Sequence, residues 1–121
     1  MTPNEMDINE VRDALARVMG WTYGRCPAGR GFDHIKDPCW HRPSEPGVAT
    51  VLYHSHPIPP TLTAAAACLP DDCRWGSMTW HRDMVTCAVA CPTTIVCGAA
   101  PDEMLARFRA ALAAWIARGE G

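Results

Sequence analysis

Residues 75–91 read WGSMTWHRDMVTCAVAC, and this stretch decides the fold class. The segments on either side of Arg82-Asp83 alternate in residue type, as strands with one buried face do. Arg82-Asp83 itself predicts a tight turn between the two strands. The face of the second strand that should be buried carries Val85, Cys87, Val89 and Cys91. The stretch therefore predicts an antiparallel hairpin, and residues 93–97 follow Pro92 as a third strand.

Helices are predicted before and after this hairpin. Residues 7–19 form the first, with Asp7 or Asn9 as its cap and Gly20 as its stop. Residues 102–118 form the last, with Asp102 at its start. The apolar stripes of the two helices are Ile8, Val11, Leu15 and Val18, and Met104, Phe108, Ala111, Leu112 and Trp115. A short alanine-rich helix is also predicted from Thr61 to Leu69, before Pro70.

The order of these elements predicts an α/β (α+β) fold of a single domain over residues 1–121. A small, mainly antiparallel sheet should carry the N-terminal and C-terminal helices packed on it. We expect Trp21, Trp75 and Trp115 to lie mostly inside, because a small core needs large side chains.

Composition limits the classes of function. The formal net charge is −2 with 20% charged residues, so the broad positive charge of a nucleic-acid-binding protein is missing. The polar, acidic N-terminus does not resemble a signal peptide, and no apolar run reaches the roughly 20 residues of a membrane span. These features predict a cytoplasmic protein that does not bind membranes.

Seven cysteines are many for 121 residues, and the number is odd. A secreted disulfide framework favours an even number and a signal sequence. Cys87, Cys91 and Cys97 occur in apolar strand-like sequence, where a free cysteine behaves as a small buried hydrophobe. We therefore interpret most of the cysteines as reduced core residues. Cys73 follows two aspartates, which should raise the pKa of its thiol.

The irregular insert, residues 22–60, contains seven of the 11 prolines and four of the five histidines. Only residues 48–53 are predicted as a strand. Thiolates and imidazoles are zinc ligands, and the candidate set here is Cys26, His34, Cys39 and His41. The spacing differs from that of conventional zinc sites, because Cys26 and His34 are far apart and only Trp40 separates Cys39 from His41.

Ordering of the insert has two alternative explanations. A structural zinc would offset the entropy of ordering, and so would packing of Phe32, Ile35 and Trp40 onto the sheet. We favour hydrophobic packing, with no cofactor. His54 and His56 would share one face of a strand and could hold a metal or an anion, but we interpret them as solvated residues. Trp40 is the predicted exposed anchor for a partner, with the local positive charge of Arg30 and Arg42 beside it.

Several short motifs resemble those of the phage ABA-sandwich domain family. They are Val18-Met19-Gly20-Trp21, the proline-introduced alanine-rich helix, the tryptophan-containing hairpin, and Arg107-Phe108-Arg109-Ala110-Ala111-Leu112. The resemblance covers residues 7–21 and 59–118. It implies a small phage or prophage protein with helices on either face of a small sheet. It carries over no catalytic or binding residue.

No stretch of the chain contains a complete catalytic constellation. The sequence therefore predicts a non-enzymatic phage or prophage accessory protein that binds a host protein, with an inhibitor of a bacterial defence system, such as an anti-CRISPR, as its most concrete form. Two alternatives are a metal-dependent hydrolase that uses the Cys/His insert and a small nucleic-acid-binding module.

Overall fold

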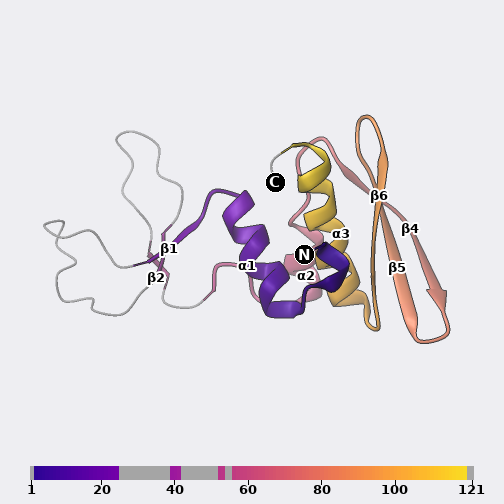
Figure 1. Cartoon of the computed structure of the whole chain (residues 1–121), viewed down its shortest axis with the longest axis horizontal. Helices are drawn as coiled ribbons and strands as arrows, with labels where there is room; N and C mark the ends of the chain where they lie inside the picture. Colours follow the sequence, from indigo (N-terminus) through magenta and orange to yellow (C-terminus); the bar gives the residue numbers. More distant parts are fainter. Residues whose placement is uncertain (1, 25–38, 42–51, 54–55, 120–121) are drawn as a thin grey trace, which may run out of the picture. The chain divides into compact units, whose positions relative to one another are not determined.

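The structure is a computed structural model, and it describes residues 2–24, 39–41, 52–53 and 56–119 (Figure 1). Contacts divide the chain into two units, one of residues 1–18 and 58–121 and the other of residues 19–57. The single-domain expectation stays a prediction.

The first unit contains a three-stranded antiparallel sheet in the order β4-β5-β6 (Figure 1). The strands are β4 (Arg74–His81), β5 (Met84–Ala90) and β6 (Ile95–Ala100). The predicted hairpin is confirmed, and His81 pairs with Met84 across the two-residue turn. Arg82 has a φ of 54° and is the only non-glycine residue with positive φ among those described. A positive φ at the first turn residue alone is a feature of type II′ hairpin turns.

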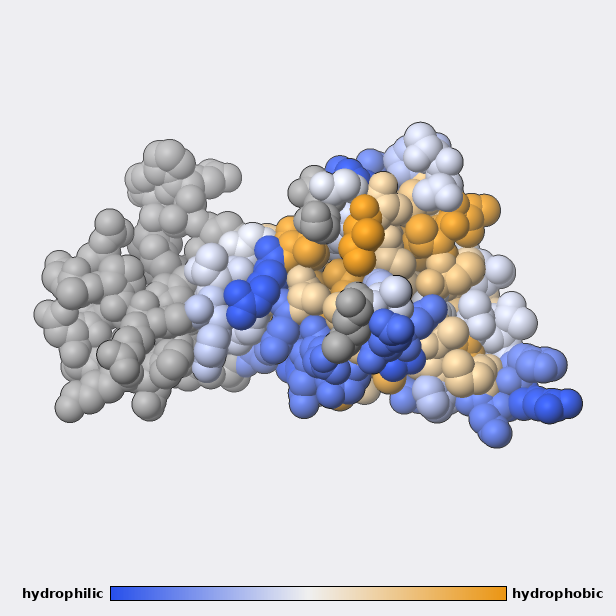
Figure 2. Space-filling view, viewed as in Figure 1, coloured by the Kyte–Doolittle hydropathy of each residue, from blue (hydrophilic) through white to orange (hydrophobic). Residues whose placement is uncertain are grey.

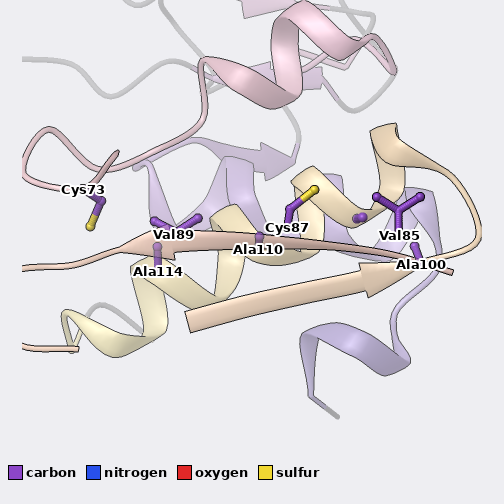
Figure 3. Packing of buried hydrophobic residues seen from close by; sticks show 8 residues of the cluster. Cys73, Val85, Cys87, Val89, Ala100, Ala110 and Ala114 are labelled. Carbon is purple, nitrogen blue, oxygen red and sulfur yellow. The ribbon is translucent and has the colours of Figure 1, made fainter. Parts of the chain in front are cut away.

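Helix α3 (Glu103–Ala117) begins where the sequence predicts, because the Asp102 carboxylate accepts a hydrogen bond from the Leu105 amide at 2.9 Å. It packs on β5 and β6 through a stripe of small residues, and Figure 3 shows Ala110 and Ala114 facing Cys87 and Val89. Gly98 of β6 permits this close approach, since a Cβ there would overlap the Ala110 backbone nitrogen. The apolar stripe predicted for α3 omits buried residues such as Ala106, Ala110 and Ala114, because the helix is buried on two sides.

The opposite side of α3 faces the other helices. Helix α1 (Ile8–Val18) packs against α3, and its buried residues include Val11 and Leu15. Asp7 is its cap: the Asp7 carboxylate accepts from the Glu10 amide at 2.8 Å, and the Glu10 carboxylate accepts from the Asp7 amide at 3.1 Å. Gly20 has a φ of 98°, which agrees with the predicted helix stop.

Two indole groups hold the short helix α2 (Leu62–Ala66), which Thr61 caps as predicted. The Trp75 indole nitrogen donates to the Ala66 carbonyl at 3.0 Å, and that of Trp115 donates to the Cys68 carbonyl at 2.7 Å. These bonds satisfy carbonyls near the end of α2, which a helix leaves without an internal partner. Trp21, Trp75 and Trp115 are each half-buried.

The fold class is confirmed: helices and a small antiparallel sheet form a mixed α/β unit. Helix α3 makes most of the helix contacts with the sheet among the described residues, and α1 and α2 pack on α3. Among the described residues, no helix is long and apolar enough to cross a membrane.

The second unit contains three very short antiparallel strands in the order β1-β2-β3. They are β1 (Thr22–Gly24), β2 (Cys39–His41) and β3 (Leu52–Tyr53). The sequence predicts a strand only at 48–53, and β3 covers the last two of those residues. The expectation of no regular element at 22–24 and 39–41 was wrong, because strands of three residues are too short to show alternation.

Candidate protein-binding site

Large apolar side chains are exposed on the sheet of the first unit. Trp80 on β4 is 61% exposed and Met78 is 38% exposed. Met84 on β5 and Ile95 on β6 are exposed as well. In the view of Figure 2, hydrophobic residues gather over α3 and the strands beside it, whereas the tip of the β4–β5 hairpin is hydrophilic. Exposed apolar side chains on neighbouring strands are typical of interaction surfaces.

The strand register assigns these side chains to two faces. Trp80 pairs with Val85 and Met78 with Cys87, and both partners are buried under α3. Directly paired residues share a face, so Trp80 and Met78 lie on the side of the sheet that α3 covers. They stay exposed because α3 packs over β5 and β6, leaving β4 beside it.

Ile95 and Met84 lie on the opposite face of the sheet. Ile95 pairs with Ala90, and Met84 pairs with His81, so these side chains point away from α3. Cys97 pairs with Ala88 on the same face and is exposed. The expectation that Cys97 is a buried core residue was therefore wrong. Successive side chains of β6 point to opposite faces of the sheet, and Cys97 lies on the face that no described helix covers.

Side chains cover the outer edge of β6 at Ala99. The Asn4 side-chain oxygen accepts from the Ala99 amide at 3.1 Å, and Arg109 Nη1 donates to the Ala99 carbonyl at 2.7 Å. Arg109 also donates to the Met6 carbonyl through Nε at 3.0 Å and Nη2 at 2.7 Å. One arginine thus fastens the N-terminal segment to the edge of β6. The two backbone groups of Ala99 are no longer open to another strand.

The outer edge of β4 is open by comparison. In the described part of the chain, no strand pairs with that edge. Seven of its eight residues are exposed, and only Trp75 is half-buried. Arg107 lies over the Trp75 ring, 4.8 Å from its centroid, and its Nε is 2.8 Å from the Glu103 carboxylate. The Trp75 indole is therefore held by Arg107 over its ring and by its hydrogen bond to the Ala66 carbonyl, while Met78 and Trp80 are exposed.

Three buried thiols of the first unit are poor nucleophiles. Burial raises the pKa of Cys68 to about 11. The pKa of Cys73 is raised to about 12, first by burial and then by Cys91 and Asp72. Burial also raises the pKa of Cys87. A catalytic cysteine needs a lowered pKa, so these three behave as the core residues that the sequence predicts.

Two of the four candidate zinc ligands lie outside the described residues. Cys26 and His34 are not described, and neither are the arginines at positions 30 and 42 that were expected beside a partner. Cys39 and His41 lie on β2, paired with Gly24 and Thr22. In the part of the chain that is described, no group of three or more His, Cys, Asp or Glu residues could hold a metal ion. The zinc hypothesis for Cys26, His34, Cys39 and His41 stays a prediction.

Trp40 does not fit the expectation of an exposed anchor. It is 5% exposed and lies on β2 between Tyr23 and His56. The Trp40 ring centroid is 5.1 Å from that of Tyr23 and 4.9 Å from that of His56, with both pairs tilted. The expectation was wrong because the strand pairing that buries Trp40 joins segments far apart in the sequence. His54 and the residues Phe32 and Ile35, which were expected to pack on the sheet, lie outside the described residues.

No protein-family model matches the chain, and no curated protein or solved structure matches it either. The geometry of the chain itself therefore carries the argument about function.

Proposed function

We propose that this chain is a non-enzymatic binding protein that takes up an extended segment of another protein at the outer edge of β4. The segment would add a fourth strand to the sheet, next to β4. Main-chain hydrogen bonds would provide affinity, and side-chain contacts would provide selectivity.

The difference between the two edges of the sheet is the observation that carries this proposal. An open strand edge exposes unpaired amides and carbonyls and invites pairing with another chain. At β6, Asn4 and Arg109 occupy both outward backbone groups of Ala99. At β4 an eight-residue strand has no comparable cover in the described part of the chain.

Met78 and Trp80 supply the apolar contacts of such a site. They are two residues apart and share a face, so a partner strand beside β4 would meet both with alternate side chains. Tryptophan is among the residues that contribute most to binding at protein interfaces. The partner segment should therefore be extended, with apolar residues at alternate positions.

The biological setting rests on the resemblance to phage ABA-sandwich domains. It supports a phage or prophage accessory protein whose partner is a host protein, including a component of a bacterial defence system such as CRISPR. A metal-dependent hydrolase and a nucleic-acid-binding module are the competing classes, and no described side chain adds support to either of them.

Affinity capture with matched variants tests the proposal. Wild-type chain, Trp80→Lys and Ile95→Lys would each be used to capture proteins from a bacterial lysate. Both substitutions place a charge at an exposed apolar position, but Ile95 lies on β6 and on the other face. We expect a partner that binds wild type and Ile95→Lys and is lost at least tenfold with Trp80→Lys.

Two results would overturn the proposal. One is a partner that Ile95→Lys loses and Trp80→Lys keeps, which would move the site to the opposite face. The other is the recovery of no specific partner together with turnover in a broad hydrolase screen, which would favour the enzyme.

A further inference from the structure

A pair of thiols lies at the end of the β4–β5 hairpin opposite its turn. The sulfur atoms of Cys73 and Cys91 are 3.4 Å apart. Cys73 directly precedes β4 and Cys91 directly follows β5, one residue beyond the Arg74–Ala90 pair. This is the one contact between two sulfur atoms that is found among the described residues.

The backbone holds both cysteines in place. The Cys73 amide donates to the Pro70 carbonyl at 3.0 Å, and the Cys91 amide donates to the Thr94 carbonyl at 2.8 Å. Figure 3 shows Cys73 beside Val89 and Ala114 at one end of the core. Strand pairing and these bonds fix both backbone segments here. Small side-chain rotations are therefore enough to bring the two sulfur atoms to bonding distance.

Cys68, Cys87 and Cys97 lack such a partner among the described residues. The Cys68 thiol donates to the Ala64 carbonyl at 3.1 Å. Cys87 and Cys97 lie on neighbouring strands, but their side chains are on opposite faces of the sheet. The geometry therefore selects one pair.

We propose that Cys73 and Cys91 are a dithiol modification site, which a low-molecular-weight disulfide such as oxidised glutathione converts into an intramolecular disulfide. The Cys91 thiolate attacks one sulfur of the small disulfide, forms a mixed disulfide and releases one small thiolate. Cys73 then loses its proton to solvent and attacks the Cys91 sulfur, which releases the second small thiolate. Two protein thiols are oxidised, and one small disulfide is reduced to two thiols.

The order of these steps follows from exposure. Cys91 is half-buried, whereas Cys73 is 7% exposed, so the small disulfide reaches Cys91 first. The second step needs the Cys73 thiolate, and the pKa of Cys73 is raised by burial, by Cys91 and by Asp72. Ring closure should therefore be slow at pH 7 and should accelerate as the pH rises toward 10.

Closure would join the two ends of the β4–β5 hairpin. The loop between Cys73 and Cys91 contains both strands, so the bond restricts the unfolded chain and stabilises the folded one. We expect the midpoint of thermal unfolding to rise by roughly 10 °C.

Mass spectrometry of the full chain tests the proposal. The reduced protein is incubated with oxidised glutathione at pH 8 in the presence of a chelator, and is then digested with trypsin. Tandem spectra should show Cys73 linked to Cys91, and the intact mass should fall by two hydrogens. Glutathione adducts on Cys91 or Cys97 with no Cys73–Cys91 link, or a link from either cysteine to a different one, would overturn the proposal.

Variants provide a second readout. Cys97→Ser removes an exposed thiol of the same sheet and should keep both the bond and the thermal shift. Cys91→Ser should lose both. The wild-type mass spectrum decides the question even where a variant fails to fold. Retention of the thermal shift by Cys91→Ser would contradict the assignment.

Discussion

The two edges of the β4-β5-β6 sheet are treated in opposite ways. At β6, helix α3 lies close above the strand, and side chains from the N-terminal segment and α3 occupy the backbone groups of Ala99. At β4, which lies beside the helix, Met78 and Trp80 are exposed. In the described part of the chain, the side chains of Asn4 and Arg109 therefore cover backbone groups at the β6 edge. The β4 edge has no such cover there.

Alanine substitution of one glycine on each edge strand should give the largest difference in stability. At Gly98 of β6 an added Cβ would overlap the Ala110 backbone nitrogen and lie 2.5 Å from the Ala106 carbonyl oxygen. At Gly76 of β4 the nearest atom, the Ala88 oxygen, would be 3.4 Å away. We expect Gly98→Ala to lower the free energy of unfolding by about 3 kcal/mol or more, and Gly76→Ala by less than about 1 kcal/mol.

Urea denaturation followed by tryptophan fluorescence measures both changes. The prediction depends on backbone atoms of α3 that cannot move without shifting the helix. Equal losses of stability for the two variants would show that α3 does not approach β6 as closely as described.

Arg109 and Arg107 provide the next comparison. Arg109→Met removes the charged donor from the Met6 and Ala99 carbonyls and should cost about 2–3 kcal/mol. Arg107→Met removes a partly exposed ion pair and a contact with the Trp75 ring, and should cost about 1 kcal/mol. Thermal unfolding of the two variants ranks them.

Opening the β6 edge should have a second consequence. An unblocked strand edge pairs with other chains, so Arg109→Met should associate at high concentration in analytical ultracentrifugation. The wild-type chain and Arg107→Met serve as controls. A larger loss of stability with Arg107→Met would reverse the importance that we give to the two edges.

The buried thiols predict a smaller effect, at alkaline pH. The pKa of Cys68 is raised to about 11 and that of Cys73 to about 12, from an ordinary value of 9.0. Above about pH 9 the unfolded chain releases these protons while the folded chain keeps them, so stability is full below pH 9 and declines as the pH rises toward 11.

Urea titrations between pH 7 and pH 11 follow this decline under reducing conditions. The double variant Cys68→Ala/Cys73→Ala should flatten it, whereas Cys97→Ala, on the exposed face, should leave it unchanged. A decline that is identical in all three proteins would assign it to other groups.

Local signals explain how much of the first unit could be predicted from the sequence. Asp7, Thr61 and Asp102 cap their helices through neighbours three residues away, and the alternation in β5 marks its buried face directly. These features depend only on nearby residues, so the sequence displays them.

The remaining features depend on residues far apart in the chain. Arg109 meets Met6 and Ala99 only after the sheet and α3 have formed, and no periodicity marks it beforehand. Trp40 is buried because β2 pairs with β1 and β3, which are too short to be visible as patterns. The open edge of β4 follows from the strand order, which local patterns do not specify. The candidate binding site was therefore outside the reach of sequence reasoning, although the exposed tryptophan belongs to the predicted hairpin.

Hydrogen–deuterium exchange of the chain, free and bound to its captured partner, tests the central claim most directly. We predict that amides within Arg74–His81 exchange at least tenfold more slowly in the complex, because the new strand accepts hydrogen bonds along the β4 edge. Amides within Ile95–Ala100 should exchange at the same rate in both states. Protection of Ile95–Ala100 with no change in Arg74–His81 would contradict the claim.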